Sequence, residues 1–413
     1  MRTIGYTSPL VPPEWIVAHG FQPAWMPLAR AGGHAPAAAS RGLCPYAGAV
    51  LAAALEVPGE GDSPHLCDDH ASMVPASGRV PTEGWSRQMG TVPFSRLAAL
   101  VMATTCDQVR HVAAVAQTRG RLPVFLLNVP AAWQSPAARP YYREELQRLG
   151  RFLIDLGGQR PSHDALVDVV LAYDRARSSL RLVPAAWPAR RLAEAILEYR
   201  GGGKPAGTGC GTAELHRETP HQPDAQAREL RGLRPSLALR VSEITGGNGV
   251  PLALVGGPLL PQDYAIFDLV ELSGGRIVLD ASETGQRTLP PPLVHEAVRQ
   301  HPLEALADAY FLGIPDVFRR PDDRLYEWLA GEIASRGVRG LLLRRYVWCD
   351  LWHAQWRRLA EWSPVPVLEI DVAGEDQGLP GRTLARLEAF LETLQQTPGR
   401  QSGGFLQAAE LSR

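Results

Sequence analysis

Short apolar runs alternate with helical segments twice along this chain, and this alternation constrains the fold more than any other feature. The runs cover 97–103 and 124–129 in the first half, and 252–255, 276–280, 341–343 and 365–371 in the second. Continuous apolar runs of this length are typical of parallel strands that are buried on both faces. The pattern therefore predicts an α/β protein with two Rossmann-like parallel-sheet domains and helices on both faces of each sheet.

A chain of 413 residues is too long for a single domain with one hydrophobic core. Changes in composition along it indicate where the domains begin and end. We predict an N-terminal α/β domain with a helical extension over 1–200, a linker over 201–235 and a C-terminal α/β domain over 236–413. A stretch rich in Pro, Gly, Ser, Asp and His over 58–90 is predicted to be an insertion in the N-terminal domain. Ligands of parallel sheets bind beyond the carboxyl ends of the strands, so we expect the functional site there.

Charge and hydropathy exclude several classes of function. The chain has 42 Lys and Arg against 43 Asp and Glu, so it lacks the basic footprint of a nucleic-acid-binding protein. No apolar run reaches the roughly 18 residues that span a bilayer, and no signal-peptide core follows Met1. These features predict a cytoplasmic protein that acts without a membrane.

Three of the five cysteines stand at predicted helix starts. Cys106 and Cys349 each follow an apolar strand and precede an Asp, and Cys44 precedes Pro45, which suits the first helical position. A helix N-terminus lowers the pKa of a thiol, and the thiolate binds soft metals and iron–sulfur clusters. No CxxC motif is present. The residues alone leave two alternatives open, which are a shared ligand site and inert buried thiols.

Several short motifs, in the same order along nearly the whole chain, resemble one family. They are Gly5-Tyr6-Thr7-Ser8 with Pro12-Pro13-Glu14, Leu43-Cys44-Pro45-Tyr46, Thr105-Cys106-Asp107-Gln108-Val109-Arg110, Tyr141-Tyr142 with Glu144-Glu145-Leu146, Gly256-Gly257-Pro258, Trp348-Cys349-Asp350, and Arg382 with Arg386-Leu387-Glu388-Ala389-Phe390. The chain thereby resembles the D-component family of the 2-hydroxyacyl-CoA dehydratases, which is related to subunits of benzoyl-CoA reductase.

The resemblance implies a [4Fe-4S] cluster between the two domains, held by Cys44, Cys106 and Cys349. It implies that the open iron faces the thioester of an acyl-CoA substrate, and that one electron passed to this substrate allows radical elimination of water. The implied partners are a homologous dehydratase subunit or a second copy of this chain, and an ATP-dependent activator protein with its own iron–sulfur cluster. The resemblance thus predicts a lyase.

Alternatives to the dehydratase follow from the same resemblance. A benzoyl-CoA reductase-like or double-cubane-type ATP-dependent reductase would share the three cysteines. A non-catalytic scaffold that kept the fold would lack iron.

The candidate catalytic residues are Ser8 and Glu14. Catalytic members of the family place a serine just before the first proline and a carboxylate on the strand after the first helix. Here the nearest serine is Ser8, while Met26 stands where the carboxylate is expected. Glu14 is either a base or simply an acid in the first turn of a helix. The resemblance therefore favours an electron-relay role for this subunit.

Other features carry weaker predictions. Cys67, within 58–90, lies between His65 and His70 and is either an extra metal ligand or part of a solvated loop. Gly256-Gly257-Pro258 is predicted to be a strand-to-helix turn, with contact to a phosphate as the alternative. Arg344 is predicted to lie on the solvated surface, with contact to an acidic partner as the alternative. Trp348, Trp352 and Trp356 are predicted to form one buried helix face.

Overall fold

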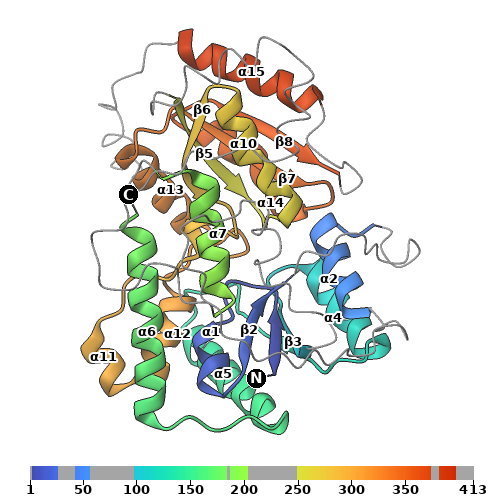
Figure 1. The fold of residues 1–413 in the computed structure, drawn as a ribbon, viewed down its shortest axis with the longest axis vertical. Helices are drawn as coiled ribbons and strands as arrows, with labels where there is room; N and C mark the ends of the chain where they lie inside the picture. Colours follow the sequence, from blue (N-terminus) through green and yellow to red (C-terminus); the bar gives the residue numbers. More distant parts are fainter. Residues whose placement is uncertain are drawn as a thin grey trace, which may run out of the picture.

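The computed structural model describes residues 2–26, 42–55, 97–183, 187–202, 249–373 and 381–396. The predicted insertion over 58–90, with Cys67, lies outside these residues, as does the predicted linker over 201–235 except for its first two residues. Figure 1 shows two sheets, each flanked by helices, with the N-terminus at the lower sheet. The α/β prediction is confirmed, because both four-stranded sheets are parallel throughout.

The first sheet has the strand order β2-β1-β3-β4. Its strands are β1 (Thr3–Tyr6), β2 (Gln22–Trp25), β3 (Leu97–Ala103) and β4 (Val124–Leu127). Its helices include α1 (Pro13–Ala18), α2 (Pro45–Leu55) and α4 (Asp107–Arg119). Side chains of β3 alternate between two hydrophobic clusters, with Val101 in one and Met102 in the other. Since both faces are covered, the whole strand is apolar.

The second sheet repeats this order as β6-β5-β7-β8. Its strands are β5 (Val250–Gly256), β6 (Gly275–Ala281), β7 (Gly340–Tyr346) and β8 (Val367–Val372). Its helices include the short 3₁₀ helix η2 (Pro261–Tyr264), α10 (Ala265–Leu272), α13 (Asp323–Ser335), α14 (Asp350–Trp362) and α15 (Gly381–Gln396). Strand order reverses between β1 and β3 and between β5 and β7. Crevices for ligands form at such reversals.

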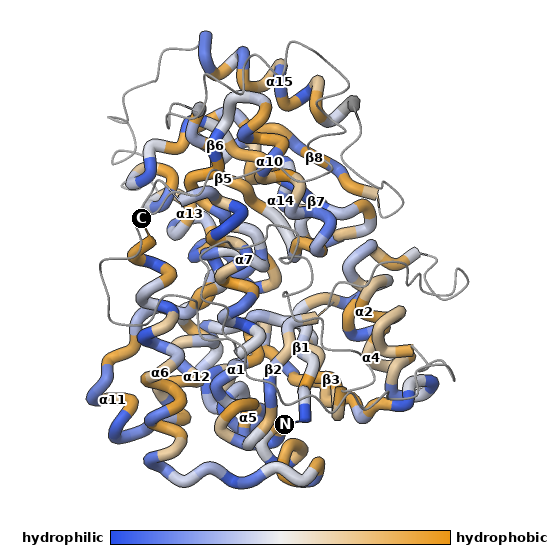
Figure 2. Tube along the Cα trace, viewed as in Figure 1, coloured by the Kyte–Doolittle hydropathy of each residue, from blue (hydrophilic) through white to orange (hydrophobic). Residues whose placement is uncertain are grey.

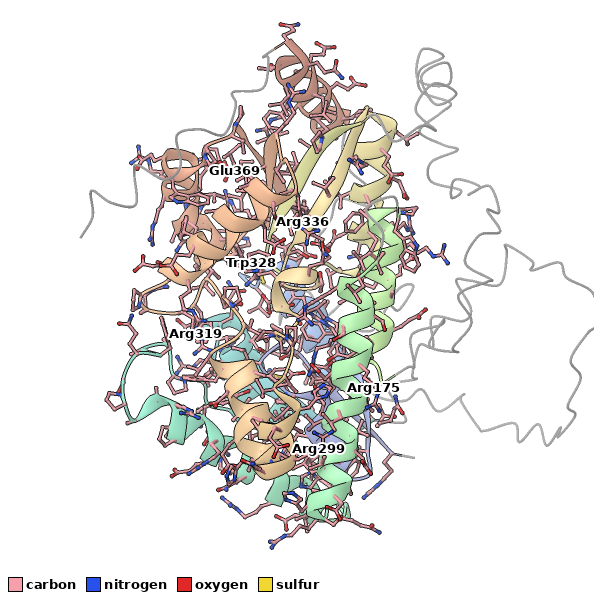
Figure 3. All side chains as sticks on the ribbon, turned by 90° about the vertical axis from the view of Figure 1, so that its left-hand side faces the viewer. Arg175, Arg299, Arg319, Trp328, Arg336 and Glu369 are labelled. Carbon is pink, nitrogen blue, oxygen red and sulfur yellow. The ribbon has the colours of Figure 1, made fainter. Side chains whose placement is uncertain are left out.

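A helical layer covers one side of the first sheet. It contains α5 (Ala138–Asp155), α6 (His163–Arg181), α11 (His295–Gln300) and α12 (Pro302–Phe311), while α7 (Ala189–Arg200) contacts β2 of the first sheet and β6 of the second. Along α6, hydrophilic and hydrophobic residues alternate, as expected for a helix with one solvated face (Figure 2). Arg175 on α6 and Arg299 on α11 mark two helices that lie in contact (Figure 3).

Helices α11 and α12 come from the second half of the chain but complete the core of the first sheet. They pack against α5 and α6, and Phe311 stacks on Tyr142 with ring centroids 5.1 Å apart. The alternation of apolar runs predicted no element between residues 281 and 321. Among the described residues, no helix is long and apolar enough to cross a membrane.

The two sheets also meet through buried side chains near the cysteines. Leu260 and Tyr346 of the second half share a hydrophobic cluster with Met26, Cys44 and other first-half residues. Arg344 belongs to the same region and forms an ion pair of 2.6 Å with Asp263, and both side chains are almost wholly buried. The prediction that Arg344 lies on the solvated surface is therefore wrong, because the residue lies within the central strand β7 and its side chain pairs with the buried Asp263.

Candidate functional site

Three helix N-termini place the cysteines. Cys106 is the N-cap of α4, Cys349 is the N-cap of α14, and Cys44 immediately precedes α2. In each case the cysteine carbonyl accepts the first helical hydrogen bond: from Gly48 to Cys44 (2.9 Å), from Arg110 to Cys106 (3.0 Å) and from His353 to Cys349 (2.9 Å). Cys106 follows β3 and Cys349 follows β7, so each lies at the strand-order reversal of its own sheet.

The three thiols come together between the two sheets. Cys44 interacts electrostatically with both Cys106 and Cys349, and Cys349 does so with Cys106. All three are free thiols, and Cys44 is 6% exposed. The structure therefore gathers residues that lie 305 positions apart (349 − 44) into one group.

One amide side chain connects the segments that carry these thiols. The backbone N–H of Cys44 donates to Oε1 of Gln108 over 2.5 Å, and Nε2 of Gln108 donates to the carbonyl of Trp348 over 2.9 Å. Gln108 lies two residues after Cys106, in the first turn of α4. A single side chain thus links all three cysteine segments.

Burial raises the pKa of all three thiols. The pKa reaches about 12 for Cys44 and about 11 for Cys349, and it is also raised for Cys106. Backbone N–H donors at the helix starts lower these pKa values, but desolvation of the thiolate is the larger effect. The expectation that helix N-termini produce thiolates is therefore wrong for the metal-free protein. A metal that binds here must displace protons.

The side chains that could bind a metal can be compared with the needs of a single metal ion and of an iron–sulfur cluster. Within the ranges that the structure describes, no three His, Cys, Asp or Glu residues are close enough together to hold one metal ion. A single ion would draw every ligand atom onto one centre. An iron–sulfur cluster binds each thiolate to a different iron, so its ligands stand farther apart. Three free thiols from three helix starts are the donor type that such a cluster takes.

A carboxyl group that the sequence analysis missed lies beside the thiols. Glu283 follows β6 and is partly buried, and its charge contributes to the raised pKa of both Cys106 and Cys349. Its N–H donates to the carbonyl of Gly257 (3.2 Å), and its carbonyl accepts from the Thr288 hydroxyl (2.8 Å). The residue thus has a fixed backbone at the carboxyl edge of the second sheet.

The Glu283 carboxyl is hard to ionise. Burial, assisted by the nearby charge of Asp316, raises its pKa to about 8, although Arg287 and Arg200 act in the opposite direction. A protonated carboxyl beside a ligand site can hold and transfer a proton. The sequence could have indicated Glu283, because it lies just after an apolar strand and ligand-binding residues gather at the carboxyl ends of parallel strands.

Similarity to known proteins agrees with this geometry. The sequence model of the family described as 2-hydroxyglutaryl-CoA dehydratase, D-component, matches residues 10–394. The chain belongs to this D-component family. A search of curated proteins found no match. The matched span contains all three clustered cysteines, Gln108 and Glu283, while Ser8 precedes it.

The D-component chain keeps Glu14 away from solvent. Glu14 is 0% exposed, and its carboxylate forms an ion pair with Arg177 and accepts a hydrogen bond of 2.7 Å from the Tyr310 hydroxyl. Ser8 is buried at the end of β1, where its hydroxyl oxygen accepts from the N–H of Leu10 (3.3 Å). These contacts tie Glu14 to α6 and α12 rather than to the cysteines.

Of two predictions about the second half of this D-component chain, the structure contradicts one and supports the other. Trp352 is 2% exposed on α14, whereas Trp348 is 61% exposed and adopts a φ of 71° before the helix begins. Trp348 therefore does not belong to the predicted buried face. Gly256 has a φ of 155°, and a Cβ there would lie 1.9 Å from the Arg344 carbonyl oxygen. This close approach supports the predicted turn.

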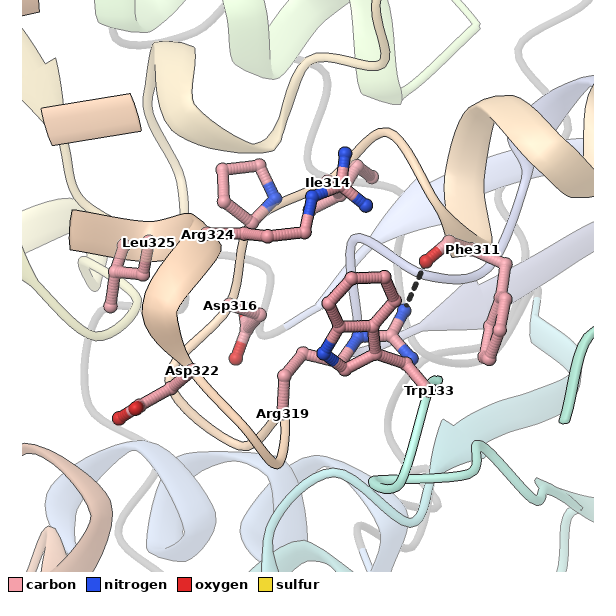
Figure 4. Close-up of a pocket in the computed structure, with 9 residues that line it drawn as sticks. Trp133, Phe311, Ile314, Asp316, Arg319, Asp322, Arg324 and Leu325 are labelled. Atoms are coloured by element: carbon pink, nitrogen blue, oxygen red, sulfur yellow. Dashed lines mark hydrogen bonds between the residues drawn. The ribbon is translucent and has the colours of Figure 1, made fainter. Parts of the chain in front are cut away.

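Two hollows among the described residues are small. One lies at the base of α13, where the Arg319 guanidinium donates to the Phe311 carbonyl over 2.6 Å (Figure 4). The other is lined by residues that include Tyr6, Trp25 and Arg200. Each has a volume of about 10 Å³, which is room for one water molecule. Neither can accept an acyl-CoA.

Proposed function

We propose that this chain is the [4Fe-4S]-binding subunit of a 2-hydroxyacyl-CoA dehydratase-type enzyme. The observation that carries the proposal is the convergence of Cys44, Cys106 and Cys349 from two sheets in a D-component chain. The three thiols would hold the cluster, which supplies a single electron to an acyl-CoA thioester when it is bound.

The protein residues supply position and a dry environment. Leu260 and Tyr346 pack against the Cys44 segment and exclude water from that side of the thiols. The backbone N–H of Ala47 points at the Cys44 sulfur over 3.4 Å and stabilises charge on it. Glu283 places a proton-holding carboxyl near Cys106 and Cys349.

We infer a relay role for this subunit, with the elimination of water completed on a homologous partner subunit or a second copy of the chain. The Glu14 carboxylate is committed to Arg177 and Tyr310, and a buried Met26 occupies the position expected for a carboxylate. The catalytic roles of Ser8 and Glu14 stay predictions. Because the two hollows are too small for an acyl-CoA, we propose that the substrate binds outside them.

An ATP-dependent activator with its own iron–sulfur cluster is the partner that we propose as electron donor. Three adjacent free thiols also require a reducing compartment, because an oxidising one would join them as disulfides. On that ground we place the enzyme in the cytoplasm.

The test is the iron and acid-labile sulfide content of anaerobically purified protein. We expect about four irons per chain in the wild type, and loss of iron in Cys44→Ala, Cys106→Ala and Cys349→Ala. Cys67→Ala is the matched control and should keep its iron. Wild-type protein without iron, even after reconstitution, would overturn the proposal. Iron-loaded protein then enters acyl-CoA assays with an activator and a partner subunit.

A further inference from the structure

Gln108 connects the two halves of the candidate site. Its Oε1 accepts the Cys44 N–H over 2.5 Å, and its Nε2 donates to the Trp348 carbonyl over 2.9 Å. The two partners lie 64 and 240 residues away along the chain. The first belongs to the first half of the chain, and the second immediately precedes Cys349.

The chemistry of the side chain suits this double contact. A primary amide offers one acceptor and one donor at fixed separation, so Gln can satisfy an N–H and a carbonyl together. A glutamate of the same length would accept the Cys44 N–H but would present a second oxygen to the Trp348 carbonyl. A methionine would make neither hydrogen bond.

The backbone conformation of Trp348 is a second, independent observation that points to a functional role for this contact. Trp348 has a φ of 71°, in the left-handed region that non-glycine residues avoid. Its side chain is 61% exposed, so packing of the indole does not explain the conformation. The conformation coincides with the hydrogen bond from Gln108 and leads directly into Cys349. Residues in such strained conformations cluster at functional sites, where the surrounding structure holds the backbone in place.

The contact is not needed to keep the two sheets together. Leu260 and Tyr346 already pack against α2, and the Tyr346 hydroxyl accepts the Leu260 N–H over 3.0 Å. Gln108 itself is only partly buried. Loss of its hydrogen bonds should therefore change local spacing rather than unfold the protein.

We propose that Gln108 is a positioning residue that sets the separation of the Cys44 and Cys349 thiols. This inference rests on the proposed function, in which both thiols hold one cluster. It assigns Gln108 no contact with substrate. The residue acts through the backbone on either side of the site, at the N–H of Cys44 and at the carbonyl before Cys349.

The test compares Gln108→Glu with Gln117→Glu. Gln117 lies on the exposed side of the same helix, where its amide donates to the Val124 carbonyl at 3.4 Å. The first readout is iron per chain with the absorption spectrum and midpoint potential of the cluster. We expect Gln108→Glu to lose at least half of its iron or to shift the potential, and Gln117→Glu to match the wild type. Gln108→Met should also lose iron or shift the potential, because methionine makes neither hydrogen bond, and its lack of charge separates this effect from the charge that glutamate adds.

The second readout needs no iron. Crystal structures of the metal-free wild type and variants give the distance between the Cys44 and Cys349 sulfur atoms. We expect this distance to increase in both Gln108 variants and to match the wild type in Gln117→Glu. An unchanged distance together with unchanged iron and potential would overturn the inference. If the wild type binds no iron but the distance still increases, the proposed function fails while the positioning role stands.

Discussion

Arg177 and Glu14 form an ion pair in which both side chains are fully buried, although 163 residues separate them in the chain. The pair is supported by the Tyr199 hydroxyl, which accepts from Arg177 over 2.9 Å, and by the Tyr310 hydroxyl. It joins α1, beside the first sheet, to α6 and α12. A buried charge without its partner is strongly unfavourable, so the pair makes these helices depend on one another.

Removing one partner of this pair should destabilise the protein. We expect Arg177→Met to lower the free energy of unfolding by about 3–5 kcal/mol, because the Glu14 carboxylate would remain buried without a cation. Urea denaturation of metal-free protein measures the change. Arg175→Met, on the exposed side of the same helix, is the control and should change stability by less than about 0.5 kcal/mol. Equal effects at both positions would contradict the buried pair.

Glu283 should make stability depend on pH. Its pKa rises from the ordinary 4.5 to about 8 in the folded chain, so between these values the folded state binds more protons than the unfolded state. Stability should therefore fall as the pH rises through this window. We expect the wild type to lose a few kcal/mol between pH 5 and pH 8.

The matched variant isolates this carboxyl. Glu283→Gln cannot ionise, so its unfolding free energy should vary less between pH 5 and pH 8, while the other titrating groups remain common to both proteins. Urea midpoints at the two pH values measure the difference. The same pH dependence in both proteins would show that Glu283 titrates normally.

Two glycines should respond in opposite directions to alanine. Gly256→Ala should destabilise by at least about 1–3 kcal/mol, because the new Cβ would lie 1.9 Å from the backbone oxygen of Arg344. Gly331→Ala should stabilise by about 0.5–1 kcal/mol, since Gly331 is exposed within α13 and a Cβ there meets nothing within 4 Å. Thermal unfolding of the two variants tests the sign of each effect.

Trp348 should prefer glycine to alanine. At a φ of 71° alanine keeps the left-handed backbone cost and glycine removes it, so Trp348→Gly should be about 1 kcal/mol more stable than Trp348→Ala. The order should reverse at Trp356, within α14, where glycine costs about 1 kcal/mol relative to alanine. Calorimetry of the four variants checks both orders. If the alanine variant were more stable than the glycine variant at both positions, the backbone of Trp348 would be unstrained.

Local sequence determined the secondary structure well. The apolar run 97–103 forms β3 over those residues, and the run 124–129 contains β4. The Cys-Asp steps and Pro45 placed three cysteines at helix starts, as observed. Such features depend on neighbours a few residues away, so they can be read along the chain. Residues 281–321 were missed because their helices are short and divided at His301-Pro302.

Reading along the chain was enough to predict two parallel α/β sheets with thiols at three helix starts. The contacts between distant segments came only from the folded arrangement: the pairing of Glu14 with Arg177, the burial of Arg344, and the bridge from Gln108 to Cys44 and Trp348. The same arrangement sets the direction of the thiol pKa shifts. Desolvation and pairing depend on what surrounds a group in space, and neighbours along the chain do not specify those surroundings. Residues 64 to 240 positions away supply those surroundings at Gln108.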